Sequence, residues 1–271
     1  MKNQFELKME GAVAYLELSH GKANEMGSDQ LDAFESLCDL IEGGGVQVLI
    51  TWSKRTSSRG TPIFIAGANV TERKGWSKDQ VMAHVRRQRD VLARVRKLPL
   101  FHIAVINGVS LGWGTEFTIT CDYRIACEGS KFGLPETGLG IIPGAGGTGE
   151  LWSQIGVPQA LRLGMTGERI GPEEALRIGL VQEVAGTVDD GLRRACEIAK
   201  LVSRNSPTAV AAFKRGVLAA IGSEGGTRQE IEALAYEHCL ETGEANIGRE
   251  NFKAILRGES VEWGPLQEFE P

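Results

Sequence analysis

The segment FHIAVINGVSLGWGTEF, residues 101–117, holds two side chains that could do chemistry. Ser110 lies at the centre of a G-x-S-x-G match, the pattern that presents a nucleophilic serine on a sharp turn between a strand and a helix. Glu116 follows a second glycine turn, G-W-G, among apolar neighbours. The segment therefore offers either a nucleophile or a carboxyl group for proton transfer.

Ser110 lacks the partners that a nucleophilic serine needs. In this class of hydrolase an acid and then a histidine follow the serine, but only His238 does so here, inside the helical pattern EIEALAYEHCL. No HGGG-type oxyanion segment precedes it. We interpret Ser110 as a small residue packed at a strand end, and keep a serine hydrolase as a remote alternative.

Residues 144–149, GAGGTG, formally match the G-x-G-x-x-G motif of dinucleotide sites. That motif requires a full strand running into the first glycine, and Pro143 stands at this point, with no lysine in P-loop position afterwards. We interpret the segment as a turn that leads into a helix. Its backbone N–H groups could still hold a water molecule or an anion.

A second acid, Glu136, lies in FGLPETGLGIIPGAGG, again beside a glycine turn and apolar residues. Taken singly, Glu116 is explained as a helix-start carboxylate and Glu136 as an exposed loop acid. Taken together, they could face one another in a dry pocket. Burial raises a carboxyl pKa, and a close second carboxylate separates such a pair into a proton donor and a proton acceptor.

The composition excludes several classes of protein. The 271 residues carry a net charge of −5, which disfavours a nucleic-acid partner. No apolar run is long enough to span a bilayer, and the N-terminus has no signal-peptide pattern. Five scattered cysteines and four histidines show no metal-site spacing, so we expect no metal, no disulfides and a cytoplasmic location. The basic clusters RRQR (86–89) and RVRK (94–97) fit a solvated helix face, with anion binding as the alternative.

Periodicity predicts an α/β fold in which strands alternate with helices. Strand patterns at 12–18 and 46–51 flank a helical pattern at 29–42. The later predicted strands are IFIAG, HIAVING, YRIAC, KFGL and LVQEVA, and the helices among them are 77–97, TEFTITCD and GPEEALRIGL. From about residue 188 only helical patterns remain. We therefore expect a core with the active site at 1–190 and a helical region at 191–271.

Three segments carry a resemblance to a known family. FIAGANV, NGVSLGWGTEFTITCDYRIA and FGLPETGLGIIPGAGGTGEL closely resemble, in order and spacing, the signature segments of the enoyl-CoA hydratase/isomerase (crotonase) superfamily. The likeness covers nearly the whole chain. It implies a spiral of β-β-α turns with a C-terminal helical trimerisation region, assembled as a homotrimer or a dimer of trimers (a homohexamer).

The resemblance also implies roles for individual residues. The backbone N–H groups of Ala68 and Trp113 would form the oxyanion hole for the enolate of an acyl-coenzyme A thioester. Glu116 would activate the water that adds at Cβ, and Glu136 would deliver a proton to Cα. Gly144 would place its N–H near that water.

Coenzyme A would be part of the substrate, with no separate cofactor. Lys22, Ala66 and Ala68 are the expected coenzyme A contacts. Trp113 departs from the family, which usually has glycine between the two flanking glycines. Its indole would either shorten or reshape the acyl pocket or lie flat against an unsaturated or ring-bearing acyl group, and the backbone would be strained if φ were positive there.

The double glutamate match implies an enoyl-CoA hydratase, a carbon–oxygen lyase of acyl-CoA and fatty acid metabolism. The alternatives are another crotonase-type reaction on an acyl-CoA (isomerase, decarboxylase or hydrolase) and a non-catalytic scaffold of this fold. The acyl group and the direction of the reaction are not given by these residues.

Overall fold

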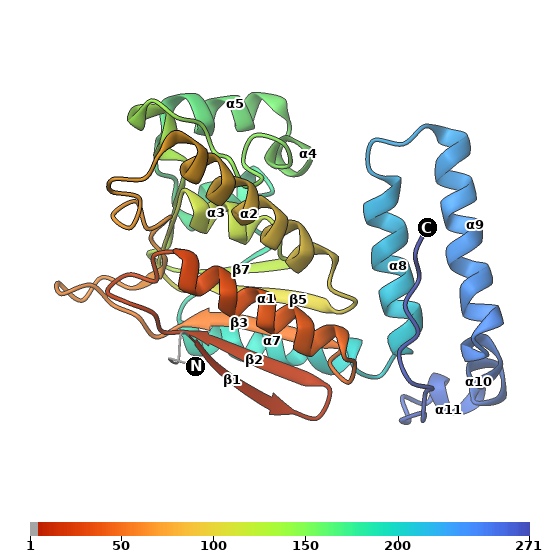
Figure 1. Ribbon diagram of the computed structural model, residues 1–271. Helices are drawn as coiled ribbons and strands as arrows, with labels where there is room; N and C mark the ends of the chain where they lie inside the picture. The colour runs from red at the N-terminus through yellow and green to blue at the C-terminus, as the bar shows by residue number, and fades with distance from the viewer. Residues whose placement is uncertain (1–4) are drawn as a thin grey trace.

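In the computed structural model, which describes residues 5–271, the chain alternates between two sheets (Figure 1). The larger sheet has the order β1-β2-β3-β5-β7-β9 and is parallel apart from the β1–β2 pair, and the smaller sheet has the parallel order β4-β6-β8. The strands are β1 (Phe5–Glu10), β2 (Val13–Leu18), β3 (Val48–Ser53), β4 (Ile63–Ile65), β5 (Phe101–Ile106), β6 (Val109–Leu111), β7 (Tyr123–Cys127), β8 (Lys131–Gly133) and β9 (Glu183–Ala185).

The helices follow the strands in a repeating order. A strand of the larger sheet, a strand of the smaller sheet and then a helix form one turn, and β3-β4-α2, β5-β6-α3 and β7-β8-η1 are three such turns in succession. This is the expected spiral of β-β-α turns. The helices are α1 (Ser28–Glu42), α2 (Lys78–Lys97), α3 (Trp113–Thr118), the 3₁₀ helix η1 (Pro135–Leu139), α4 (Leu151–Ile155), α5 (Val157–Thr166), α6 (Pro172–Arg177), α7 (Val188–Val202), α8 (Pro207–Ala220), α9 (Gly225–Glu241), α10 (Glu244–Glu250) and α11 (Phe252–Leu256).

The central strands are buried on both faces, which is typical of parallel sheets covered by helices. Leu49 of β3 and Ala104 of β5 face the main core, which α1, α2 and α3 cover. Ile50 and Ile103 face the opposite side and pack against α7. Residue 190, the predicted boundary, lies within α7, and α7 packs in this second core.

Two arginines of α2 join it to α1. Arg87 binds Glu35 (Nη2 to Oε2, 2.7 Å) and Asp32, and Arg94 binds Asp39 (Nη2 to Oδ1, 2.6 Å) and Glu42. The predicted solvated basic face of α2 is thus partly neutralised, because Arg87 and Arg94 pair with acids of α1 while their side chains stay 36% and 34% exposed. The acids at 32, 35, 39 and 42 lie on successive turns of one face of α1, so they can meet a parallel row of cations.

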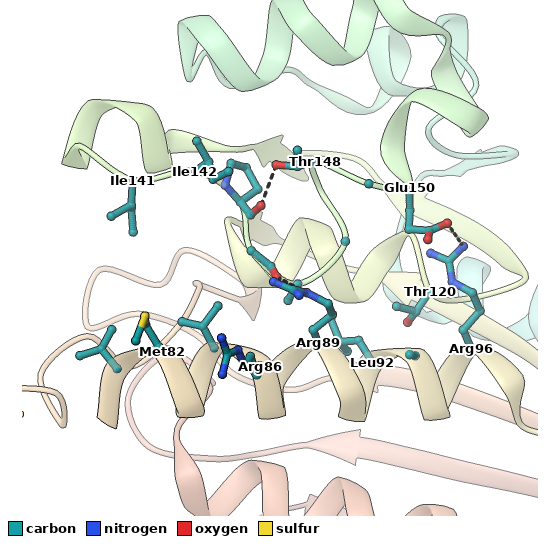
Figure 2. Close-up of a pocket in the computed structure, with 18 of the residues that line it drawn as sticks. Met82, Arg86, Arg89, Leu92, Arg96, Thr120, Ile141, Ile142, Thr148 and Glu150 are labelled. Atoms are coloured by element: carbon teal, nitrogen blue, oxygen red, sulfur yellow. Dashed lines mark hydrogen bonds and ion pairs between the residues drawn. The ribbon is translucent and has the colours of Figure 1, made fainter. Parts of the chain in front are cut away.

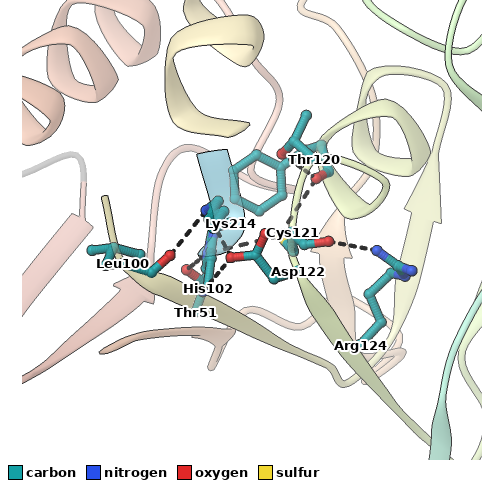
Figure 3. Close-up of polar contacts among 9 residues, drawn as sticks. Thr51, Leu100, His102, Thr120, Cys121, Asp122, Arg124 and Lys214 are labelled. Atoms are coloured by element: carbon teal, nitrogen blue, oxygen red, sulfur yellow. Dashed lines mark hydrogen bonds and ion pairs between the residues drawn. The ribbon is translucent and has the colours of Figure 1, made fainter. Parts of the chain in front are cut away.

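Helices α8 to α11 form an arm that stands apart from the sheets (Figure 1). The ammonium group of Lys214, on α8, anchors the arm to the larger sheet (Figure 3). It donates to Asp122 Oδ2 at 2.7 Å and to the Leu100 carbonyl oxygen at 2.9 Å, and the same Asp122 oxygen accepts the His102 backbone N–H at 2.8 Å. Both side chains of the ion pair are largely buried, with 10% and 16% exposed.

Sequence patterns missed the edge strand β1, the short strand β6 and the helices α5, α10 and α11. Among the residues that the structure describes, no helix has the length and apolarity needed to cross a membrane. All five cysteines are free thiols.

Replacing Lys214 by methionine should destabilise the arm. The substitution leaves the Asp122 carboxylate largely buried without its cation, and breaking a buried pair in this way costs about 3 kcal/mol. Urea unfolding should show this loss, and amide hydrogen exchange should accelerate first in α8. Lys200→Met, at an exposed position of α7, is the matched control and should change stability by less than about 0.5 kcal/mol. Equal effects of the two variants would contradict the anchoring role.

Candidate active site

Segments from three consecutive β-β-α turns meet at one place. They are the loop after β4, the start of α3, and the stretch from η1 to residue 147. Each of the three follows a strand of the smaller parallel sheet β4-β6-β8, so they emerge at the same edge. The order of strands in this sheet therefore brings residues from 66 to 147 together.

Glu116 lies in the first turn of α3 and is only 3% exposed. Its Oε1 accepts two backbone hydrogen bonds, from Ala145 N at 2.7 Å and from Gly147 N at 2.9 Å. Burial raises the pKa of this carboxyl group above its ordinary value, although the two amides and the nearby Arg89 guanidinium reduce the rise. The carboxylate is thus held in a fixed position by backbone donors of another turn of the spiral.

Glu136 lies in η1 and is half-buried. Its Oε2 is buried and has no hydrogen-bond partner among residues 5–271. Burial raises the pKa of Glu136 to about 7, and the negative charge of Glu116 adds to the rise. A carboxyl group with this pKa holds and releases a proton near neutral pH.

Gly112 lies where the two acids approach each other. Its φ of 53° is in the left-handed region that favours glycine, and a Cβ atom here would lie 2.7 Å from Glu136 Oε1. The Gly112 carbonyl oxygen accepts the backbone N–H of Glu116 at 3.0 Å. Absence of a side chain at residue 112 therefore allows the Glu136 carboxylate to reach the start of α3.

Two backbone amides beside this point are free. Ala68 follows Gly67, whose α-carbon packs so closely on Leu111 that an added Cβ would lie 3.3 Å from the Leu111 carbonyl oxygen. Trp113 is the first residue of α3, a position where the N–H has no partner within the helix. Among residues 5–271, neither amide donates a hydrogen bond.

The indole of Trp113 does not narrow the site, so that expectation was wrong. The side chain is 2% exposed and packs in the main core, with ring centroids 5.8 Å from Phe117 and 6.1 Å from Phe34. The residue has a helical backbone, and Asn24 is the one non-glycine residue with positive φ among those described. Trp113 therefore offers its amide without strain and turns its side chain inward.

The GAGGTG segment holds an anion that belongs to the protein itself. Ala145 and Gly147 donate to the Glu116 carboxylate, and the Gly144 carbonyl oxygen accepts Arg89 Nε at 3.0 Å. Of these residues of the turn and its partner arginine, the sequence singled out Gly144. It did not single out Ala145, Gly147 or Arg89 as partners. The signal was present in a glycine-rich turn recognised as able to hold an anion, but the pattern alone could not show which anion.

Two of the expected coenzyme A contacts, Lys22 and Ala66, lie on neighbouring segments, and the third, Ala68, is one of the two free amides. Ala66 N donates to the Ala23 carbonyl oxygen at 3.1 Å, which places the loop containing Lys22 beside β4. Lys22 is exposed at the tip of this loop. Its ammonium group is therefore accessible to an anionic ligand.

Ser110 is fully buried in β6, and its Oγ lies 3.0 Å from Thr118 Oγ1. His102 is the histidine nearest to Ser110 in the sequence, and its Nε2 lies 2.8 Å from Thr51 Oγ1 in a hydrogen bond. Burial, with a smaller contribution from Lys214, lowers the pKa of His102 to about 3, so its ring is neutral near pH 7. The arrangement gives Ser110 a threonine partner in place of a histidine base.

Comparison with known proteins places this geometry in a family. The sequence model of the enoyl-CoA hydratase/isomerase family matches residues 56–257. YngF of Bacillus subtilis is 36% identical over 241 residues, covering 87% of this chain and 90% of that protein. The short-chain-enoyl-CoA hydratase of Clostridium acetobutylicum is 33% identical over 243 residues, covering 89% and 90%.

A solved structure agrees over the whole fold. The crystal structure of an enoyl-CoA hydratase from Bacillus anthracis superimposes with a TM-score of 0.87 at 33% identity, covering 96% of this chain and 99% of that one. The chain belongs to the enoyl-CoA hydratase/isomerase family.

Proposed function

We propose that this protein adds water to an α,β-unsaturated acyl-CoA thioester, or removes it in the reverse direction. One observation carries the proposal, namely two acids and two free backbone amides that surround Gly112. The family is that of enoyl-CoA hydratases and isomerases. The presence of two acids in place of one favours hydration, because adding water requires one group to take a proton and another to give one.

The amides of Ala68 and Trp113 would hold the thioester oxygen. When a nucleophile adds at Cβ, the π electrons move toward this oxygen, and the enolate that develops carries negative charge there. Two fixed N–H donors stabilise that charge without reorganising, and removing one such donor typically costs about 3–4 kcal/mol of barrier. The N–H of Trp113 is available as a donor because it lies at the start of a helix, where backbone N–H groups have no partner within the helix.

The two acids would divide the proton transfers. Glu116, whose pKa is raised by burial and which accepts two backbone hydrogen bonds in a fixed position, takes a proton from water as the oxygen bonds to Cβ. Glu136, with a pKa of about 7, donates its proton to Cα as the enolate electrons form the new C–H bond. The sum of these steps is the addition of one H and one OH across the double bond.

The coenzyme A moiety would lie on the Lys22 side. Lys22 is an exposed cation suited to a phosphate group, and Ala66 and Ala68 offer backbone contacts along the strand end. The acyl group would then extend the other way, past the two acids.

The arm supports assembly as a homotrimer or a dimer of trimers. It exposes large apolar side chains, which burial against a second copy would stabilise. Those most exposed are Phe213 (75%), Leu256 (71%), Tyr236 (69%) and Phe252 (59%).

Glu116→Gln and Glu136→Gln should each lower kcat for hydration of an enoyl-CoA by about 100-fold or more, because each removes one proton-transfer step. Hydration is followed as loss of the ultraviolet absorbance of the conjugated thioester. Both variants should still bind a saturated acyl-CoA. Glu128→Gln, at an exposed position after β7, should keep full activity. Wild-type turnover in both site variants would rule out the two-acid mechanism.

The Glu136 carboxyl group should titrate near pH 7 in the free protein, well above the ordinary value of 4.5. Glu116→Gln removes the neighbouring negative charge and should lower this pKa, although burial keeps it above the ordinary value. Carbon-detected NMR of ¹³C-labelled glutamate measures the Glu136 pKa in the unmodified protein and in Glu116→Gln. The Glu136→Gln variant assigns the signal. A Glu136 pKa that does not change in Glu116→Gln would show that the two carboxylates do not interact.

A further inference from the structure

A cavity of about 970 Å³ lies between α2 and the segment 140–150 (Figure 2). It falls in the size range of small-molecule binding sites. Figure 2 shows α2 along one wall, with Arg86, Arg89 and Arg96 on the side that faces the cavity, and Ile141 and Ile142 on the opposite wall. The function proposed above does not use this space.

The cavity adjoins the acids through a shared wall. Ala145 lines it and also donates its N–H to Glu116 Oε1 at 2.7 Å. Gly144 lines it too, and the Gly144 carbonyl oxygen binds Arg89. A ligand in the cavity is therefore one backbone thickness from the Glu116 carboxylate.

The cavity borders the Glu116 side of the site. Ala66 contacts Ala23 on the coenzyme A side, and the neighbouring Gly67 packs on Leu111. Gly112 contacts the Glu136 carboxylate, and Glu116 is bound by the 145–147 amides that border the cavity. A thioester held at residues 68 and 113 with its coenzyme A toward Lys22 would direct its acyl group toward this cavity.

The lining combines apolar side chains with uncompensated positive charge. Five cations line it, and the one acid among the lining residues, Glu150, is bound to Arg96 at 3.1 Å. The cations are Arg73, Arg86, Arg89, Arg96 and Lys97. Val85, Leu92 and Ile142 contribute apolar surface.

Among the lining cations, Arg86 and Lys97 have no side-chain hydrogen bond or ion pair within residues 5–271, and Arg73 has one, from Nη2 to Gln88 Oε1 at 3.3 Å. The Arg86 side chain is exposed and forms no hydrogen bond or ion pair within residues 5–271, in contrast to the adjacent Arg87, which two acids of α1 neutralise. Arg73 is half-buried, and its Nε is a buried donor without an acceptor in the part of the chain that the structure describes. The neighbouring acid, Glu72, is directed to His84 and the Ser28 N–H.

An arginine in a partly apolar cavity favours a carboxylate or phosphate ligand, because the guanidinium group matches the planar geometry of such anions. The phosphates of coenzyme A lie on the other side of the reacting centre in the proposed binding mode. We propose that the acyl group carries a free carboxylate at the end far from the thioester, and that Arg86, Arg73 and Arg89 bind this carboxylate in the cavity. This inference rests on the proposed function and names its substrate class, the ω-carboxylated enoyl-CoA thioesters.

The test compares matched pairs of CoA esters that differ only at the far end of the acyl chain. Hexanoyl-CoA and adipoyl-CoA form one saturated pair, and longer pairs cover the depth of the cavity. Dissociation constants come from calorimetry, and kcat/KM from the corresponding enoyl-CoA esters. For the best-fitting length, the carboxylated ester should bind at least about tenfold more tightly than its neutral partner, as expected for a charge-assisted hydrogen bond.

Variants of the lining residues test whether the cavity causes the tighter binding of carboxylated esters. Arg86→Met should reduce the ratio of the two affinities by about tenfold, and Arg86→Lys, which keeps the charge without the planar fork, should reduce it less. Arg193→Met, on the exposed face of α7, is the control and should leave the ratio unchanged. Thermal unfolding of each variant without ligand shows that it is folded.

The outcomes separate this inference from the proposed function. Tighter binding of carboxylated esters without hydration of any enoyl-CoA would reject the hydratase proposal and retain the cavity assignment. Equal or weaker binding of the carboxylated ester at every chain length would overturn the cavity assignment, even if hydration is fast. An equal loss of affinity for both members of a pair in Arg86→Met would also overturn it, because the cation would then serve the coenzyme A moiety.

Discussion

The hydrogen bonds from Ala145 and Gly147 to the buried Glu116 carboxylate are the interaction on which the site depends. A carboxylate in this position is costly to bury, and the two backbone donors offset part of that cost and fix its position. The same two bonds join α3, in one turn of the spiral, to the segment after η1 in the next. The two hydrogen bonds that position the Glu116 carboxylate therefore also connect successive turns of the spiral.

Close backbone approach completes the arrangement. Gly114 packs so tightly on β4 that a Cβ atom would lie 2.2 Å from the Ile65 carbonyl oxygen, and Gly112 admits the Glu136 carboxylate. These contacts hold β4 and the loop after it against the start of α3, the two segments that carry the amides of residues 68 and 113. Arg89 links this centre to the cationic cavity, since it binds the Gly144 carbonyl oxygen and acts on the pKa of Glu116.

The sequence allowed the α/β class, the long helices and the two acids to be predicted, because periodicity and glycine turns are local signals. The β1 strand was missed although it pairs with β2 along its whole length, because its edge position leaves it with a weak burial pattern. The inward rotation of Trp113 depends on Phe34, which is distant in sequence, so no local pattern could indicate it. The partners of the GAGGTG amides and of the cations 73, 86 and 89 likewise appear only once the turns of the spiral stack.

The most direct test of the account is a crystal structure of this protein with a 3-hydroxyacyl-CoA bound. The account predicts a thioester oxygen at about 2.7–3.1 Å from both Ala68 N and Trp113 N. It also predicts that the hydroxyl oxygen on Cβ lies between the carboxylates of Glu116 and Glu136. A thioester that contacts neither amide, or a Cβ hydroxyl distant from both carboxylates, would contradict it.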